Sequence, residues 1–228
     1  MKLSKCVLMA LVGLFLLNTS AFAQLTILNE FRQADLGVGT PEWDYYHDYQ
    51  NHPGAGEWDV TCALSLPGFS GEVSHFSILE SEGDGATILG SLKSSWGADG
   101  PELYSSLFSK NYLDLWVQCE DPFRLSGTVE VTGQYEGYDD YIWMRLREGE
   151  ADGPIILDEY YSLGNFDVDF TSDGADNQYK FEFRVEENLS NLIEETSNLE
   201  VEIRLILEPV VPVSTKRDHW GQVKSLFR

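Results

Sequence analysis

The chain has 228 residues and is strongly acidic, with 38 Asp and Glu against 15 Lys and Arg and a formal net charge of −23. Residues 24–208 hold 37 of the acids and nine of the basic residues, a net charge of −28. Such a body is repelled by nucleic acid and by anionic membrane surfaces, because both require clustered Lys and Arg. The 13% content of aromatic residues predicts a folded domain rather than a disordered acidic chain.

The N-terminus has the parts of a secretory signal peptide. Lys2 and Lys5 precede an apolar stretch over residues 6–17, and Ala21-Phe22-Ala23 forms an A-x-A cleavage site. The apolar stretch is shorter than the roughly 20 residues of a membrane-spanning helix. We therefore expect cleavage before Gln24, no membrane span in the mature chain, and a protein that is secreted or on the cell surface, or periplasmic if retained.

Apolar and polar residues alternate along most of the chain after residue 57. The clearest run is 123–132, with an apolar residue or Gly at every odd position. A period of two is typical of strands with one wet face. Similar runs predict strands at 58–66, 73–80, 86–95, 112–120, 142–147, 155–161, 166–170, 179–186 and 199–208. About ten strands separated by Gly, Asp and Asn turns predict an all-β protein, a two-sheet antiparallel β-sandwich.

This pattern predicts four parts of the chain. Residues 1–23 are the signal peptide, and 24–56 form an irregular segment rich in aromatic and acidic residues. The sandwich domain covers 57–208, and 209–228 form a linker and a basic tail. About 185 residues suit one domain with its own core.

The span from about residue 75 to 208 resembles the jelly-roll-type β-sandwich domains of exported bacterial proteins of unknown function. The matching features are a Ser-rich strand before Trp96, an apolar strand at 113–119, Phe-Arg-Leu-Ser-Gly at 123–127 and Tyr-x-Phe-x-Phe at 179–183. The chain ends in a second segment, similar to one that closes many exported proteins of poorly characterised bacterial lineages. It consists of Trp220, Gly221, Val223, Lys224, Leu226, Phe227 and Arg228 with two intervening residues.

Two cysteines, Cys62 and Cys119, remain after removal of the signal peptide. Both fall at apolar positions of predicted strands, and an even number of cysteines in an exported protein favours a disulfide. The sequence therefore predicts a Cys62–Cys119 bond. The alternative is a pair of buried thiols.

The sequence carries no motif for catalysis. It has four histidines and no Gly-x-Ser-x-Gly, phosphate loop or Cys/His zinc set. Glu57-Trp58-Asp59 resembles the start of the Glu-x-Asp-x-x-Glu strand of jelly-roll glucanases, but Cys62 replaces the third acid. We expect a noncatalytic protein, with a polysaccharide-active enzyme of the jelly-roll glycoside hydrolase type as the alternative.

Two groups of aromatic residues are candidate ligand sites. The first is Trp43, Tyr45, Tyr46 and Tyr49, and the second is Tyr135, Tyr138, Tyr141 and Trp143. Aromatic rings offer a stacking face for the apolar side of a sugar, and neighbouring carboxylates accept bonds from its hydroxyls. Alternatively, these rings pack the N-terminal segment onto the sandwich.

Acidic turns are candidate calcium sites, since calcium takes carboxylate and carbonyl oxygens from loops. The turns contain Asp139, Asp140, Asp173 and Asp176. Asp is also what turns require for their own geometry, so a structural calcium ion and ordinary turns both remain open. No other cofactor is expected. The expected function is that of a surface or matrix component or a glycan-binding module, with a glycan or another surface protein as partner.

The tail reverses the charge of the body. Lys216, Arg217, Lys224 and Arg228 face one acid, Asp218, and two prolines precede them. Trp220, Val223 and Phe227 are spaced so that a short helix would present them on one face. The tail is therefore predicted to be an export, sorting or docking signal, or a route to self-association; the alternative is an end with no role.

Deleting residues 216–228 is expected to leave the melting temperature unchanged, because the strand pattern ends before the tail. It is expected to change where the protein is found, or its self-association at low salt, because the basic charge is removed from an acidic body. Cell fractionation and sedimentation measure these effects. Identical localisation and assembly of the truncated protein would contradict the signal hypothesis.

Overall fold

The computed structural model describes residues 25–42, 44–54, 56–82, 85–99, 104–119, 122–134, 141–149, 152–173, 178–192 and 196–210. These residues form twelve strands and the turns between them, with no helix in the described ranges. The strands are β1 (Thr26–Gly39), β2 (Tyr45–His52), β3 (Gly56–Leu66), β4 (Phe69–Glu82), β5 (Gly85–Ala98), β6 (Tyr104–Gln118), β7 (Phe123–Gln134), β8 (Tyr141–Glu148), β9 (Ile155–Tyr160), β10 (Gly164–Thr171), β11 (Gln178–Leu192) and β12 (Thr196–Pro209).

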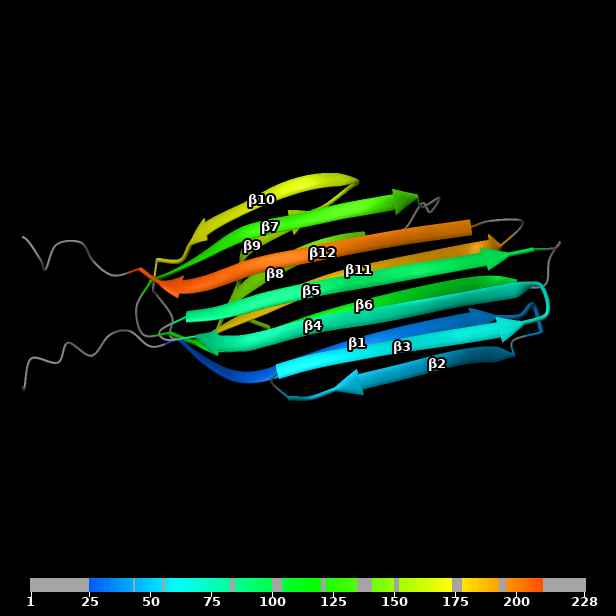
Figure 1. Ribbon diagram of the computed structural model, residues 1–228, viewed down its shortest axis with the longest axis horizontal. Coiled ribbons are helices and arrows are strands. Elements are labelled where there is room, and N and C mark those ends of the chain that lie inside the picture. Colours follow the sequence, from blue (N-terminus) through cyan, green and yellow to red (C-terminus); the bar gives the residue numbers. More distant parts are fainter. Residues whose placement is uncertain are drawn as a thin grey trace, which may run out of the picture.

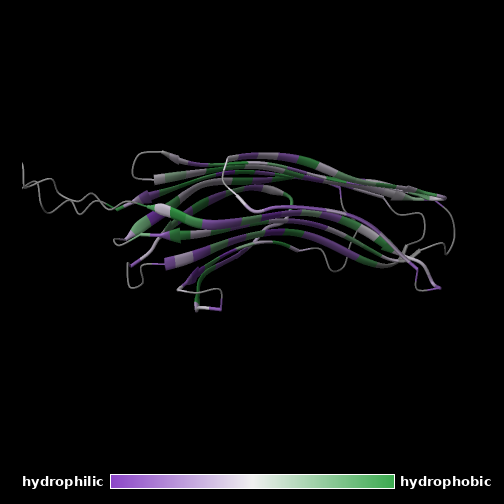
Figure 2. Cartoon of the chain, turned by 90° about the horizontal axis from the view of Figure 1, so that it is seen from below, coloured by the Kyte–Doolittle hydropathy of each residue, from purple (hydrophilic) through white to green (hydrophobic). Residues whose placement is uncertain are grey.

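The strands form two six-stranded antiparallel sheets. Sheet A has the order β2-β1-β6-β11-β8-β9, and sheet B has the order β10-β7-β12-β5-β4-β3 (Figure 1). The sheets lie one over the other and curve together (Figure 2). The predicted all-β class and two-sheet antiparallel sandwich are confirmed, with two more strands than expected.

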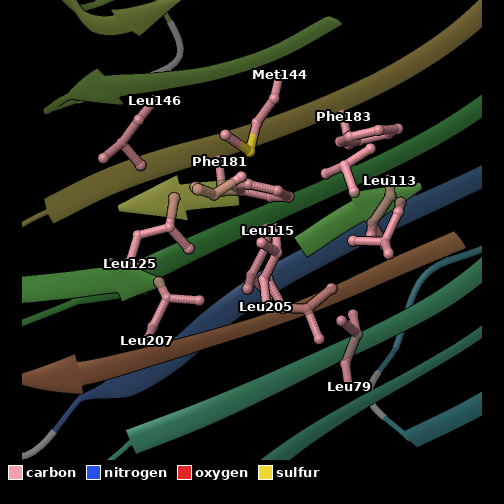
Figure 3. Packing of buried hydrophobic residues seen from close by; sticks show 14 of the residues in the cluster. Leu79, Leu113, Leu115, Leu125, Met144, Leu146, Phe181, Phe183, Leu205 and Leu207 are labelled. Atoms are coloured by element: carbon pink, nitrogen blue, oxygen red, sulfur yellow. The ribbon is translucent and has the colours of Figure 1, made fainter. Parts of the chain in front are cut away.

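The core lies between the inner faces of the two sheets. Leu113 and Leu115 of β6 and Phe181 and Phe183 of β11 project from sheet A and are fully buried. Side chains of sheet B meet them, among them Leu125, Leu205 and Leu207 (Figure 3). The alternation that predicted the strands therefore marks the residues that hold the sheets together, at about 1.5–3 kcal/mol for each fully buried large apolar side chain.

The sequence predicted an irregular N-terminal segment, but residues of this segment form the two strands β1 and β2. β1 pairs with β2 on one side and with β6 on the other. On its inner face, Ile27 is followed after the register shift by Glu30 and Arg32, which are charged and buried, so the apolar alternation is interrupted. β2 is an edge strand with mostly exposed side chains, and it therefore shows no apolar stripe.

A seam of buried polar side chains crosses the interior and divides the core into two apolar clusters. On β6, Leu107 belongs to the smaller cluster and Leu113 to the larger, with Ser109 and Asn111 between them. The seam consists of residues that are at most 5% exposed: Glu30, Arg32, His75, Ser77, Ser94, Ser109, Asn111, Glu187 and Ser197. The smaller cluster contains Trp58, Cys62 and Trp96, and the larger one contains the residues of Figure 3.

Hydrogen bonds across the seam connect the two sheets. Ser109 of sheet A donates to Ser94 Oγ of sheet B at 2.8 Å. Arg32 Nη1 donates to Ser77 Oγ at 3.2 Å and to the Gly56 carbonyl at 3.0 Å. These bonds offset much of the cost of burying polar groups, which would otherwise be several kcal/mol for an ion.

The predicted disulfide is wrong, because Cys62 and Cys119 lie at different places along the sandwich and are not bonded to each other. Cys62 is in the smaller cluster, and its Sγ lies 3.3 Å from the Ala34 carbonyl. Ala34 pairs with Asn111 of β6, and Cys119 lies eight residues beyond Asn111 in the larger cluster. At about 3.3 Å per residue the two cysteines are roughly 25 Å apart, whereas a disulfide requires Cα atoms within about 7 Å.

Because His75 is buried, we expect the free energy of unfolding to fall in acid. Burial first, and then the charge of Arg32, lower the pKa of this fully buried imidazole to about 3. The unfolded chain takes up the proton near pH 6.5 and the folded chain does not, so this contribution to stability is complete above pH 6.5 and falls towards pH 3. Below pH 6.5 the free energy of unfolding is expected to decrease by up to about 1.4 kcal/mol per pH unit.

Denaturant unfolding from pH 7 to 5 measures this effect. His75→Gln, which retains a group able to bond Ser77 Oγ, is expected to remove the slope contributed by the histidine. The control His47→Gln changes an exposed ring and is expected to keep the slope. Equal slopes in wild type and His75→Gln would contradict a neutral buried His75.

Candidate functional site

The outer face of sheet A brings both predicted aromatic groups onto one surface. On β2, Tyr45 and Tyr49 pair with Gly39 and Asp35. Both partners occupy positions of β1 on the side away from the core. On β8, Tyr141 and Trp143 pair with the outward residues Glu186 and Arg184 of β11. Tyr46 lies on the opposite side of β2. Trp43, Tyr135 and Tyr138 are outside the described residues.

Further aromatic residues complete this surface, which we call the aromatic face. Phe108, Tyr112 and Trp116 come from β6, and Tyr160 comes from β9. They were missed because the sequence does not show that β6 lies between β1 and β11. The available signal was the spacing of four between the β6 rings, which places them on the side opposite the core residues of the same strand.

Most of the basic residues of the domain also lie on the aromatic face. Of the nine Lys and Arg in residues 24–208, five occupy outward positions of β6, β8 and β11: Lys110, Arg145, Arg147, Lys180 and Arg184. In a body of net charge −28, this face is therefore close to neutral, since its outward acids balance these cations: Asp35, Asp114, Asp158, Glu182 and Glu186.

Ion pairs join these cations to two central acids, Asp114 and Glu182, which pair across β6 and β11. Arg184 binds both oxygens of Asp114, with Nη2 to Oδ2 at 2.8 Å. Lys180 Nζ lies 3.3 Å from Asp114 Oδ2 and 2.7 Å from Glu182 Oε1, and Arg147 Nε lies 2.8 Å from Glu182 Oε2. Both acids are less than 10% exposed although they lie outside the core.

The electrostatics keep Glu182 ionised. Burial alone would raise the pKa of Glu182, but hydrogen bonds from Lys180 and Arg147 outweigh it, and the pKa is lowered. A carboxylate in this state does not hold a proton near neutral pH. Its role on the aromatic face is structural, since it holds Lys180 and Arg147 in place.

A stack of alternating rings and guanidinium groups crosses the aromatic face. Arg184 Cζ lies 4.2 Å from the ring centre of Tyr112 and 5.5 Å from that of Trp143. Arg145 Cζ lies 4.3 Å from Trp143 and 5.8 Å from Tyr160. Trp143 is therefore in contact with two cations and is a structural ring of the stack.

Other tyrosine rings on the aromatic face remain accessible. Tyr49 is 39% exposed and Tyr141 is 44% exposed. They stand at the two ends of a row that runs across the strands through Asp35, Lys110 and Glu186. We call these five residues the tyrosine row. Four strand spacings separate its ends, about 19 Å.

Gly37 of β1 makes room for an aromatic stack beside the tyrosine row. A Cβ atom at Gly37 would collide with the ring of Phe108, so this ring rests directly on the β1 backbone. Phe108 stacks with Tyr45 at 5.3 Å between ring centres and 19° between planes. The stack fixes the orientation of Tyr45, which is 51% exposed.

Of the remaining predicted sites, the structure describes Asp173, Glu57 and Asp59, and none of these three lies on the aromatic face. Asp173 is exposed after β10, and Asp139, Asp140 and Asp176 lie outside the described residues. Within the described ranges, no group of three or more His, Cys, Asp and Glu side chains is arranged to hold a metal ion. Glu57 and Asp59 are exposed on β3, at the edge of sheet B. The tail segment Trp220–Arg228 also lies outside the described part of the chain.

The fold and the aromatic face define a two-sheet antiparallel β-sandwich in which one outer face combines aromatic rings with balanced charge. Comparison of the chain with protein-family models, curated proteins and solved structures gave no match. Among the described residues, no helix is long and apolar enough to cross a membrane.

Replacing Arg184 with Met is expected to lower the free energy of unfolding by about 3 kcal/mol, because it leaves the buried Asp114 with Lys180 alone. Removing both partners, with Asp114→Leu and Arg184→Met together, is expected to recover most of the loss. Urea unfolding measures both. A single variant as stable as wild type would show that the pair does not hold the face together.

Proposed function

We propose that this protein is a noncatalytic exported β-sandwich that binds a glycan along the tyrosine row of sheet A. One observation carries the proposal: two accessible tyrosine rings stand at the ends of a row of hydrogen-bonding side chains on an open sheet face. Tyrosine rings stack on the apolar side of a sugar, and Asp35, Lys110 and Glu186 supply acceptors and a donor for its hydroxyls.

The contrast between the two outer faces supports this choice. The outward positions of sheet B carry mainly hydroxyl and acidic residues, such as Ser70, Ser95 and Thr196. Phe76 is the one aromatic residue at the outward positions described in that sheet. Rings are therefore concentrated on sheet A, as expected where one face meets a ligand and the other meets water.

A noncatalytic role fits the state of the central acids. A glycosidase needs a protonated carboxyl beside an ionised one. Asp114 and Glu182 are both tied to cations, and the pKa of Glu182 is lowered. Export by the signal peptide would place the protein at the cell surface, in an extracellular matrix or in the periplasm. The proposal also includes a structural calcium ion at the acidic turns.

A polysaccharide-active enzyme is the second candidate, and one observation favours it. Burial raises the pKa of Asp35, which suits a general acid. Glu186 lies two strands away on the same row, about 10 Å between backbones. Carboxyl groups of inverting glycosidases are about 6.5–9.5 Å apart.

Replacing Tyr49 or Tyr141 with Ala is expected to weaken polysaccharide binding at least about tenfold, because each change removes a stacking ring. The matched control is Tyr46→Ala, which removes a ring of similar exposure from the other side of β2. Glycan arrays identify the polysaccharide, and calorimetry measures the affinities. No wild-type signal on the arrays, or equal losses in all three variants, would overturn the proposal.

An assay for new reducing ends separates the two candidates. The noncatalytic proposal expects no reducing ends from the bound polysaccharide. Release of reducing ends that is abolished by Asp35→Asn would instead establish the enzyme.

A further inference from the structure

The two accessible rings of the tyrosine row are too far apart for a single sugar unit to contact both. Tyr49 of β2 and Tyr141 of β8 are exposed, and β1, β6 and β11 lie between them. At about 4.8 Å per strand, their backbones are about 19 Å apart. A pyranose ring is about as wide as the tyrosine ring on which it stacks, so one sugar unit covers one ring. A ligand that contacts both rings is therefore a chain of several units.

The spacing of the tyrosine row matches the repeat of a sugar chain. Each of five neighbouring strands contributes one residue to the row, and the strands lie about 4.8 Å apart. A pyranose unit with its glycosidic oxygen advances an extended chain by a similar length. A chain that crosses the strands thus places one unit over each of them, the first over Tyr49 and the fifth over Tyr141.

Lys110 and Glu186 supply polar contacts in the middle of the row. Both side chains are partly exposed, and they lie opposite each other on β6 and β11. The Lys110 ammonium group lies 5.0 Å from the ring centre of Phe108, and Glu186 accepts a hydrogen bond from Tyr112. An ammonium group has three donors and a carboxylate has several acceptor sites, so each has capacity left for a hydroxyl group of the ligand. The third and fourth units of the chain lie over these two residues.

The geometry and the charge of the protein select the kind of chain. In an extended chain of β-linked pyranose units, successive units are turned over, so the first and fifth units present the same side to the sheet. One such side faces each tyrosine. A wound chain, such as an α-linked glucan, does not follow a straight row. The acidic body, with its net charge of −28, repels a polyanionic chain, so a neutral one is favoured.

We propose that the tyrosine row binds five consecutive units of a neutral, extended, β-linked glycan that crosses the strands of sheet A. Tyr49 stacks on the first unit and Tyr141 on the fifth, and Lys110 and Glu186 bond hydroxyl groups of the third and fourth. This five-unit site rests on the proposed function, because it occupies the same surface, and it specifies the length and shape of the ligand.

The test titrates full-length mature protein with cello- and chito-oligosaccharides of two to six units, and with malto-oligosaccharides as wound chains of the same lengths. Calorimetry measures the affinities. In at least one β-linked series, the pentasaccharide is expected to bind at least about tenfold more tightly than the trisaccharide, because only the longer chain reaches both tyrosines. A sixth unit is expected to add little, and the malto-oligosaccharides are expected to bind more weakly.

Tyr49→Ala and Tyr141→Ala each remove one end of the site. In either variant the pentasaccharide is expected to bind about as weakly as the trisaccharide binds wild type, because one stacking ring remains. The trisaccharide is expected to lose little, since it moves to the remaining tyrosine. The matched control Tyr46→Ala changes an exposed ring on the other side of β2 and is expected to keep the wild-type dependence on length.

The outcomes separate this site from the proposed function. Glycan arrays without a wild-type signal overturn both. If the arrays give a ligand, the five-unit site alone is overturned by any of three results: neither β-linked series binds, the trisaccharide or a malto-oligosaccharide binds as tightly as the pentasaccharide, or the Tyr49→Ala and Tyr141→Ala variants keep the wild-type dependence on length.

Discussion

The antiparallel ladder between β6 and β11 is the interaction on which the rest of the molecule depends. Each strand has one side in the core and one side on the aromatic face. Leu113 and Phe183 therefore sit opposite each other inside, while Asp114 and Glu182 sit opposite each other outside. A shift of one residue in this register would exchange the two sides, exposing the apolar residues and burying the acids without their cations. The hydrophobic core and the ion pairs of Asp114 and Glu182 thus stabilise the same register.

Ion pairs and contacts between cations and aromatic rings hold the side chains of the aromatic face in place. Four of the five basic residues of this face form ion pairs with acids, and four of the five lie over aromatic rings. This arrangement buries charged groups on the outside of a sheet, where water would otherwise separate them. It also leaves a surface with little net charge.

The sequence predicted the fold well wherever one face of a strand is wet. The runs 123–132 and 199–208 fall in β7 and β12, and within these two runs every inner residue is apolar or Gly. It failed at β1, since Glu30 and Arg32 face inward and the hydrogen bonds that stabilise the buried Arg32 come from residues far along the chain. Alternation gives the side of a strand but not its neighbours, and the disulfide prediction failed for that reason.

The sequence predicted some residues of the candidate site but not their arrangement. Tyr45, Tyr49 and Tyr141 were visible as a local concentration of rings. Their position on one face depends on the sheet order, which inserts β1, β6 and β11 between β2 and β8. Nothing in the local sequence around Trp143 shows that Arg184, from a distant strand, covers its ring. Long-range pairing therefore decides which rings remain accessible.

The seam through the interior has a consequence for the dynamics of the sandwich. Apolar contacts give a protein its cooperativity, and here they are interrupted by hydrogen-bonded serines, Asn111 and an ion pair. We therefore expect the end of the sandwich around Trp58 and Trp96 to open at a lower free energy than the end around Phe181. Backbone amides on the two sides of the seam would exchange with solvent at separate rates, so that one continuous pair of sheets behaves as two folding units.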